Sequence, residues 1–135
     1  MQSKPRILYV EDEPMSRMVM DILLKRKLGF KDVVIFEDST DIMSRIEKLE
    51  NKPDVIFLDI HVPPHNGFEI LAMLRKHQDY KDTQVIALTA SVMNEEVEEL
   101  KTAGFNGGIA KPIDQASFGS LLDRIIKGDE VWSIA

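Results

Sequence analysis

Short aliphatic runs alternate along this chain with longer stretches in which apolar residues recur every three or four positions. A short run of β-branched residues suits a strand that is covered on both faces, whereas the longer spacing suits the apolar face of a helix. Such alternation is typical of a parallel sheet whose strands are connected by helices. Five units of this kind fill the sequence. Their strands are expected at Ile7–Val10, Val33–Phe36, Val55–Leu58, Val85–Leu88 and around Ile109.

Each stretch between the strands carries an apolar stripe that predicts a helix. We expect Asn94 to cap the fourth helix, and we expect the fifth helix to lie between Asp114 and Gly128. The stripe of the first helix comprises Met15, Met18, Val19, Ile22 and Leu23.

The length of 135 residues is usual for a single domain that buries its own core. Because no repeat or Pro/Gly/Ser-rich linker divides the chain, we expect one domain over residues 1–128 and a short C-terminal tail over residues 129–135. The tail is expected to be frayed; the alternative is that Val131, Trp132 and Ile134 pack on the domain or on a partner. From this division we expect no attached DNA-binding or enzymatic domain.

The charge and composition of the chain restrict its chemistry and its partners. A net charge of −6 at pH 7 argues against nucleic-acid binding. Because cysteine is absent, any nucleophile must be an oxygen or a nitrogen. No apolar run approaches the roughly 20 residues that span a bilayer, and the N-terminus lacks a signal-peptide core. We therefore predict a cytoplasmic protein without membrane contact.

Polar residues follow four of the expected strands at the point where each strand ends. Glu11 and Asp12 follow the first, Asp59 the third, Thr89 the fourth and Lys111 the fifth. Each of these residues alone would be ordinary in a surface loop. Together they bring three carboxylates, a hydroxyl and an ammonium group to the edge of the sheet where parallel α/β proteins bind ligands. Carboxylates held this close repel one another unless a cation neutralises them.

The predicted cation is magnesium, because it prefers hard oxygen ligands and keeps positions open for water and phosphate. Without a cysteine or a glycine-rich phosphate loop, the simplest chemistry is attack of a carboxylate on phosphorus to give an acyl phosphate. The cation and Lys111 would offset the charge of the phosphoryl oxygens.

In these features the chain resembles the receiver domain of bacterial response regulators. The resemblance rests on the acidic pair after the first strand, VIFLDI ending at Asp59, LTA with Thr89, and KP with Lys111, in that order. It implies an α/β, doubly wound, flavodoxin-like fold with five parallel strands in the order 2-1-3-4-5. It also implies a stand-alone domain that accepts a phosphoryl group from a sensor histidine kinase or a histidine phosphotransfer protein and loses it by slow hydrolysis. Such a domain is expected to signal by protein–protein contact or to act as a phosphate shuttle or sink, as a monomer or weak dimer.

The resemblance assigns a role to each position. Asp59 is the expected phosphoacceptor and a metal ligand, Asp12 a direct metal ligand, and Glu11 a ligand largely through water. The backbone carbonyl of His61 is expected to complete the ligands to magnesium.

The remaining positions are expected to contact the phosphoryl group or to transmit its presence. Thr89 matches the hydroxyl that bonds the group, Ala90 the small residue that leaves access to it, and Lys111 the ammonium that pairs with it. The bond between Lys111 and Pro112 is expected to be cis.

Two positions depart from the family pattern. The side chain of His61 either points into solvent or leans over the phosphoryl group and alters attack by water. Gly108 stands where the family usually has an aromatic switch residue, so that switch cannot operate; Gly107 and Gly108 instead suggest close backbone approach or a bent edge strand. The exposed face of the first helix, with Met15, Arg17 and Met18, matches the family's docking surface for phosphotransfer partners.

Three other classes of protein share part of this pattern. A phosphatase of the haloacid dehalogenase type needs an acid two residues after the nucleophile, where this chain has His61. A flavodoxin-like carrier needs a hydroxyl- and glycine-rich loop after the first strand, where this chain has acids that would repel phosphate. A pseudo-receiver that only binds proteins would not need the full set of chemical positions.

Overall fold

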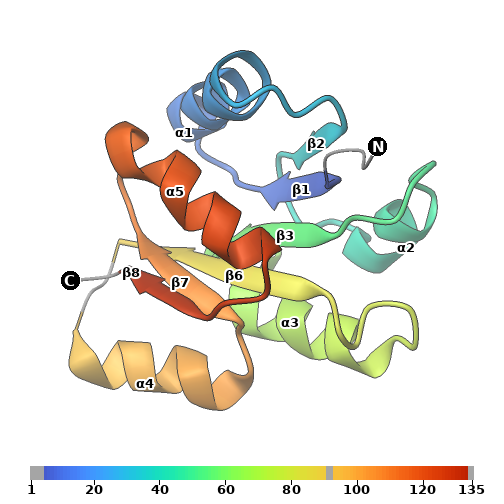
Figure 1. Cartoon of the computed structure of the whole chain (residues 1–135). Coiled ribbons are helices and arrows are strands. Elements are labelled where there is room, and N and C mark those ends of the chain that lie inside the picture. Colours follow the sequence, from blue (N-terminus) through green and yellow to red (C-terminus); the bar gives the residue numbers. More distant parts are fainter. Residues whose placement is uncertain (1–4, 91–92, 134–135) are drawn as a thin grey trace.

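The computed structural model describes residues 5–90 and 93–133, which form a parallel sheet with helices on both faces (Figure 1). Its strands lie in the order β2-β1-β3-β6-β7-β8. In chain order they are β1 (Ile7–Val10), β2 (Val33–Phe36), β3 (Val55–Asp59), β6 (Gln84–Thr89), β7 (Gly107–Ala110) and β8 (Val131–Ser133). A two-stranded hairpin, β4 (His61–Val62) and β5 (His65–Asn66), follows β3.

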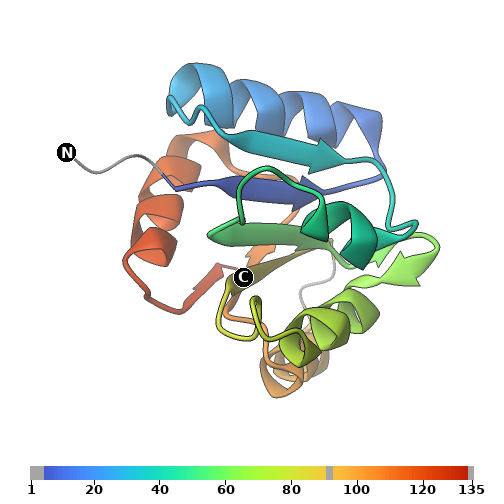
Figure 2. The same ribbon diagram turned by 90° about the vertical axis from the view of Figure 1, so that its right-hand side faces the viewer.

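The helices divide into two layers, one on each face of the sheet (Figure 2). One layer holds α1 (Pro14–Asp21), its π-helical continuation η1 (Ile22–Lys27) and α5 (Gln115–Ile126). The other holds α2 (Ile42–Glu47), α3 (Gly67–Lys76) and α4 (Asn94–Ala103). Successive strand residues point to opposite layers, so the β1 residue Leu8 packs with α3 while Tyr9 packs with α5.

The predicted doubly wound α/β fold is confirmed. The hairpin strands β4 and β5 lie outside the main sheet. The first five strands of the main sheet, counted along the chain, have the expected order 2-1-3-4-5, because they lie in the order β2-β1-β3-β6-β7. Among the described residues, no helix is long and apolar enough to cross a membrane.

The sheet has a sixth strand where a frayed tail was expected. β8 pairs in parallel with β7, and Val131 is only 1% exposed. Gly128, with a φ of 97°, ends α5 and lets the chain turn back towards the sheet. A Cβ on Gly107 would lie 2.5 Å from the Val131 carbonyl oxygen, so the missing side chain permits this approach. The expectation of a frayed end is therefore wrong for Val131–Ser133, whereas Ile134 lies outside the described residues.

The apolar residues of the first helix are divided between the surface and the core, and Met15 and Met18 lie on the exposed face that the family resemblance implies. Met15, Met18 and Ile22 are 59%, 52% and 45% exposed, whereas Met20 and Leu24 are buried with Leu23. The sequence carries two apolar stripes at helical spacing, and only one of them can face the sheet.

Of the two predicted helix caps, the structure confirms the one on α5 and moves the one on α4 by one residue. Asp114 caps α5 by accepting a hydrogen bond from the Ala116 N–H at 3.3 Å, as predicted. The cap of α4 is Met93, without a side-chain bond, so the prediction of Asn94 is wrong by one residue.

Candidate functional site

Three carboxylates meet at the carboxyl ends of the central strands. Glu11, Asp12 and Asp59 each offer an oxygen atom within 4.8 Å of the others. Glu11 is fully buried and Asp59 is 7% exposed, whereas Asp12 faces solvent. They meet because β1 and β3 are neighbours in the sheet, with Leu58 directly beside Val10. The sequence prediction that these acids share one edge is confirmed.

Lys111 reaches into this acidic cluster from the end of β7. Its Nζ lies 2.9 Å from Glu11 Oε1 and 3.3 Å from Asp59 Oδ2. Its backbone N–H donates to the Thr89 carbonyl at 2.8 Å, which ties it to the end of β6. The peptide bond to Pro112 is cis, as expected. Burial acts to lower the pKa of Lys111, but Glu11 and Asp59 outweigh that effect, and the pKa is raised.

Glu11 has a further partner that the sequence analysis missed. The Tyr9 hydroxyl donates to Glu11 Oε1 at 2.7 Å, and Tyr9 is 1% exposed. Burial raises the pKa of the Glu11 carboxyl, and Asp59 raises it further, while Tyr9 and Lys111 act to lower it. The alternation of a strand was the available signal, because residues two apart point to the same side.

The loop after β3 fixes the surroundings of Asp59. The His61 N–H donates to Asp59 Oδ1 at 3.3 Å, and the Gly67 N–H donates to the Ile60 carbonyl at 2.7 Å. A Cβ on Gly67 would lie 2.9 Å from Ile60 Cδ1, so a glycine allows α3 to begin this close to the loop.

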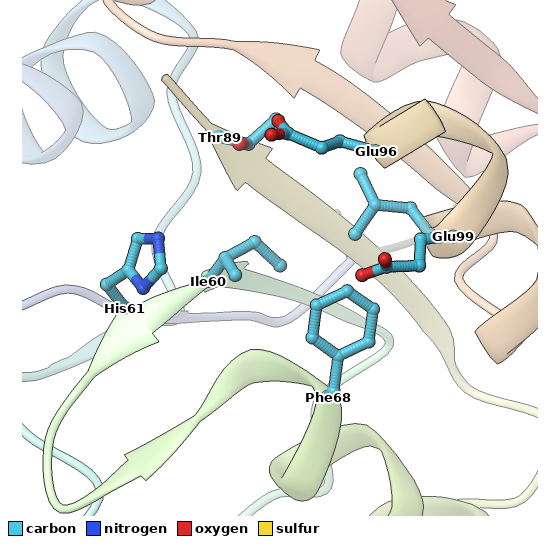
Figure 3. A pocket seen from close by; sticks show the side chains of 7 residues that line it. Ile60, His61, Phe68, Thr89, Glu96 and Glu99 are labelled. Atoms are coloured by element: carbon cyan, nitrogen blue, oxygen red, sulfur yellow. The ribbon is translucent and has the colours of Figure 1, made fainter. Parts of the chain in front are cut away.

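A cavity of about 280 Å³ opens beside this loop. It is lined by His61 on one side and by Glu96 and Glu99 of α4 on the other, with Thr89 at the end of β6 (Figure 3). Ala90, directly after Thr89, is exposed. The predicted hydroxyl and small residue thus lie at the same rim as the acids.

Gly108 lies in β7, away from this rim. It is buried, and it pairs with Ala87 of β6 and with Trp132 of β8. Close backbone approach, one of the two explanations for the glycine pair, holds for its neighbour Gly107.

The start of α1 is bonded to the acidic cluster. Glu13 caps the helix by accepting hydrogen bonds from the Ser16 N–H at 2.7 Å and the Met15 N–H at 3.2 Å. The Arg17 guanidinium donates to the Glu11 carbonyl at 3.0 Å, so Arg17 supports the site as well as lying on the helix surface.

The donor set fits a magnesium ion, because it consists of clustered carboxylate oxygens beside an open, solvent-facing Asp12. One acid, Glu11, already has its oxygens bonded to Tyr9 and Lys111, which fits a ligand that acts through water rather than directly.

Comparisons with known proteins agree with this geometry. The family model for the response regulator receiver domain matches residues 7–123. Chemotaxis protein CheY-3 of Vibrio cholerae is 30% identical over 90% of this chain and 92% of its own. The chemotaxis response regulator CheY4 of Vibrio cholerae superposes with a TM-score of 0.80 and 26% identity, over 91% of this chain and 99% of its own.

A second solved structure is the receiver domain of the sensor histidine kinase PA1611 of Pseudomonas aeruginosa, with a magnesium ion coordinated in its active-site cleft. It superposes with a TM-score of 0.78 and 28% identity, over 93% of this chain and 99% of its own. These matches favour a receiver over a phosphatase or a flavin carrier. The chain belongs to the response regulator receiver domain family of two-component signalling.

Proposed function

We propose that Asp59 accepts a phosphoryl group from a phosphohistidine of a sensor histidine kinase or histidine phosphotransfer protein, with magnesium bound beside it. The observation that carries this proposal is the meeting of Asp59 with Glu11, Asp12 and Lys111 at one edge of the sheet. Phosphorylation of an aspartate with magnesium is general for the family.

In the proposed reaction a carboxylate oxygen of Asp59 attacks phosphorus, the P–N bond of the phosphohistidine breaks, and the imidazole leaves with the bonding pair. Asp12, Asp59 and the His61 carbonyl would hold a magnesium ion, with Glu11 acting through water, and the ion would supply charge neutralisation for the phosphoryl oxygens. The Lys111 ammonium and the Thr89 hydroxyl bond to these oxygens, and exposed Ala90 leaves access to them.

The acyl phosphate is lost when water attacks phosphorus, which breaks the P–O bond and restores the Asp59 carboxylate. His61 lines the cavity beside Thr89, where its side chain can influence this water. In His61→Ala we expect a changed lifetime of the phosphorylated protein; an unchanged lifetime would remove His61 from the hydrolysis step.

The direct test is incubation with acetyl phosphate and magnesium followed by mass spectrometry of the intact protein. Wild type is expected to gain one phosphoryl group, and Asp59→Asn to gain none. Asp79→Asn, a control on an exposed aspartate, is expected to behave as wild type. Labelling of Asp59→Asn to the wild-type level would disprove the assignment.

The exposed stripe of Met15, Met18 and Ile22 on α1 and η1 supports a docking site for the helices of the phosphotransfer partner. Because it lies beside the acidic cluster, a partner seated there can present a histidine to Asp59. Met18→Glu is expected to slow transfer from the partner at least about tenfold by burying a charge in the interface. Transfer from acetyl phosphate should not change in this variant.

Ala72→Glu provides the control for that variant, because Ala72 is exposed on α3, across the sheet from α1. Equal phosphotransfer to Met18→Glu and Ala72→Glu would rule out docking on this stripe. Arg17 is a poorer probe, because its substitution also removes the bond to the Glu11 carbonyl. The division of the chain at residue 128 and its cytoplasmic location stay predictions.

A further inference from the structure

The Tyr9 hydroxyl is a buried polar group that the proposed reaction does not use. Tyr9 lies in the centre of the first strand, 1% exposed, and its ring packs in the apolar cluster with Phe57 and Phe118. A phenylalanine would fill the same space. The hydroxyl therefore serves its hydrogen bond of 2.7 Å to Glu11 Oε1, the one bond that it donates among the described residues.

Glu11 depends on few donors. Oε1 accepts from the Tyr9 hydroxyl at 2.7 Å and lies 2.9 Å from Lys111 Nζ. Oε2 accepts from Lys111 Nζ at 3.2 Å and from the Glu13 N–H at 3.3 Å. Because Glu11 is 0% exposed, water does not replace a lost partner at low cost. Tyr9 and Lys111 are thus the two close donors to this carboxylate among the described residues.

Lys111 serves two acids at once. Its Nζ also lies 3.3 Å from Asp59 Oδ2. When a phosphoryl group is attached to Asp59, its oxygens compete with Glu11 for this single ammonium. A turn of Lys111 towards the phosphoryl group leaves Tyr9 as the close donor to the Glu11 charge among the described residues, beside the magnesium-bound water through which Glu11 would act.

We propose that Tyr9 is a positioning residue for phosphoryl transfer, and that its hydroxyl holds the Glu11 carboxylate when Lys111 turns from Glu11 to the phosphoryl group. This inference rests on the proposed function of Asp59. In the resting state both Lys111 and Tyr9 donate to Glu11. In the phosphorylated state Lys111 has turned away, so the Tyr9 hydroxyl has a larger role there.

The test compares Tyr9→Phe with wild type in binding beryllofluoride, a phosphoryl mimic, at saturating magnesium, followed by ¹⁹F NMR. We expect Tyr9→Phe to bind beryllofluoride about tenfold more weakly, since a hydrogen bond to a charged group is stronger than one between neutral groups. Its affinity for magnesium alone should change by less than about threefold, because Lys111 still pairs with Glu11 in that state.

Tyr80→Phe is the matched control. Tyr80 is the other of the two tyrosines, is 5% exposed, and precedes β6, at the end of the sheet opposite the acidic cluster. It should bind beryllofluoride as wild type does. Failure of both wild type and Tyr80→Phe to bind would refute the proposed function itself, whereas wild-type affinity in Tyr9→Phe refutes only the role of Tyr9. Equal losses of magnesium and beryllofluoride affinity would also refute it, because they would show a general defect of the site.

A double-mutant cycle tests whether Tyr9 acts through Glu11. In the Glu11→Gln background, Tyr9→Phe should weaken beryllofluoride binding by less than about twofold, because no buried charge remains to be held. A tenfold effect in that background would overturn the proposal.

A measurement on wild type covers the case in which Tyr9→Phe does not fold. With tyrosine labelled at the ring carbon that carries the hydroxyl, the protein gives two ¹³C signals, one for each tyrosine. Beryllofluoride should move the Tyr9 signal and leave the Tyr80 signal in place. A Tyr9 signal that does not move would count against any change in its bond to Glu11.

Discussion

Glu11 is buried beside two other acids, and the Lys111 ammonium pairs with two of the three, Glu11 and Asp59. Glu11→Gln removes one of these charges while it keeps the shape of the side chain. Without magnesium, we therefore expect the variant to be more stable than wild type at pH 7, by about 1 kcal/mol. Urea unfolding with a chelator present measures the difference. Glu50→Gln, on an exposed glutamate, should leave stability unchanged.

The stability difference between Glu11→Gln and wild type should depend on pH, because the Glu11 carboxyl titrates. The pKa of Glu11 is raised above its ordinary value of 4.5, first by burial and then by Asp59. The folded protein therefore binds a proton at Glu11 more readily than the unfolded chain, and this contribution to stability is lost as pH rises through the raised pKa. The advantage of Glu11→Gln should shrink as the pH falls from 7 towards 4.5, because Glu11 then becomes neutral too. An advantage that grows on acidification would contradict this account.

At the scale of single residues, the sequence identified the groups that end strands but not the contacts between them. Asp12, Asp59 and Lys111 follow apolar runs, and parallel strands bring such residues to one edge. Tyr9 lies inside a run, where its ring accounts for its presence. The two-residue spacing of Tyr9 and Glu11 places their side chains on the same side of the strand, but their bond also depends on the depth of the Glu11 side chain, which that spacing does not encode.

At the scale of elements, strands with strong apolar runs were predictable and the added strand was not. β1, and β3 up to Leu58, are continuous aliphatic or aromatic runs, which favour strands that are buried on both faces. β8 has three residues and no such pattern. Its pairing depends on a distant property, the absence of a side chain at Gly107. The first helix was predictable as a helix, but its buried face was not. Two sets of apolar residues have helical spacing, and only contact with the sheet determines which set is buried.

Gly107→Ala tests the basis of β8. Its Cβ would meet the Val131 carbonyl oxygen at 2.5 Å, and neither backbone can yield without breaking the pairing. We expect a loss of about 1–3 kcal/mol in the free energy of unfolding. Trp132, the only tryptophan, lies in β8, so its fluorescence should shift to the red as the strand becomes more exposed.

Gly119→Ala is the matched control for that prediction. A Cβ there meets the end of the flexible Leu28 side chain at 3.1 Å, which can shift. Because alanine favours a helix over glycine by about 0.5–1 kcal/mol, this variant should be as stable as wild type or more so, with unchanged Trp132 fluorescence. Equal stability of the two variants would mean that β8 does not depend on the close approach at Gly107.

At the scale of the whole molecule, the site exists only when the sheet is complete. Lys111 and Glu11 are separated by 100 positions in the sequence, and β3 and β6 lie between their strands. Their approach to 2.9 Å therefore requires four adjacent strands in the right order. Ligands of the acidic cluster bind the folded chain and not the unfolded one, so their binding must appear as added stability.

Magnesium should stabilise the whole protein through Asp12, which is exposed and is one of the three clustered acids. At ten times its dissociation constant, magnesium adds about 1.4 kcal/mol to the free energy of unfolding, or roughly 4–8 °C to the Tm of a domain of this size. Asp12→Asn should lose most of this gain, yet be as stable as wild type in chelator, because it relieves repulsion. Thermal unfolding with magnesium and with chelator measures both effects, with Asp79→Asn as the control. A full gain in Asp12→Asn would show that the ion is held elsewhere.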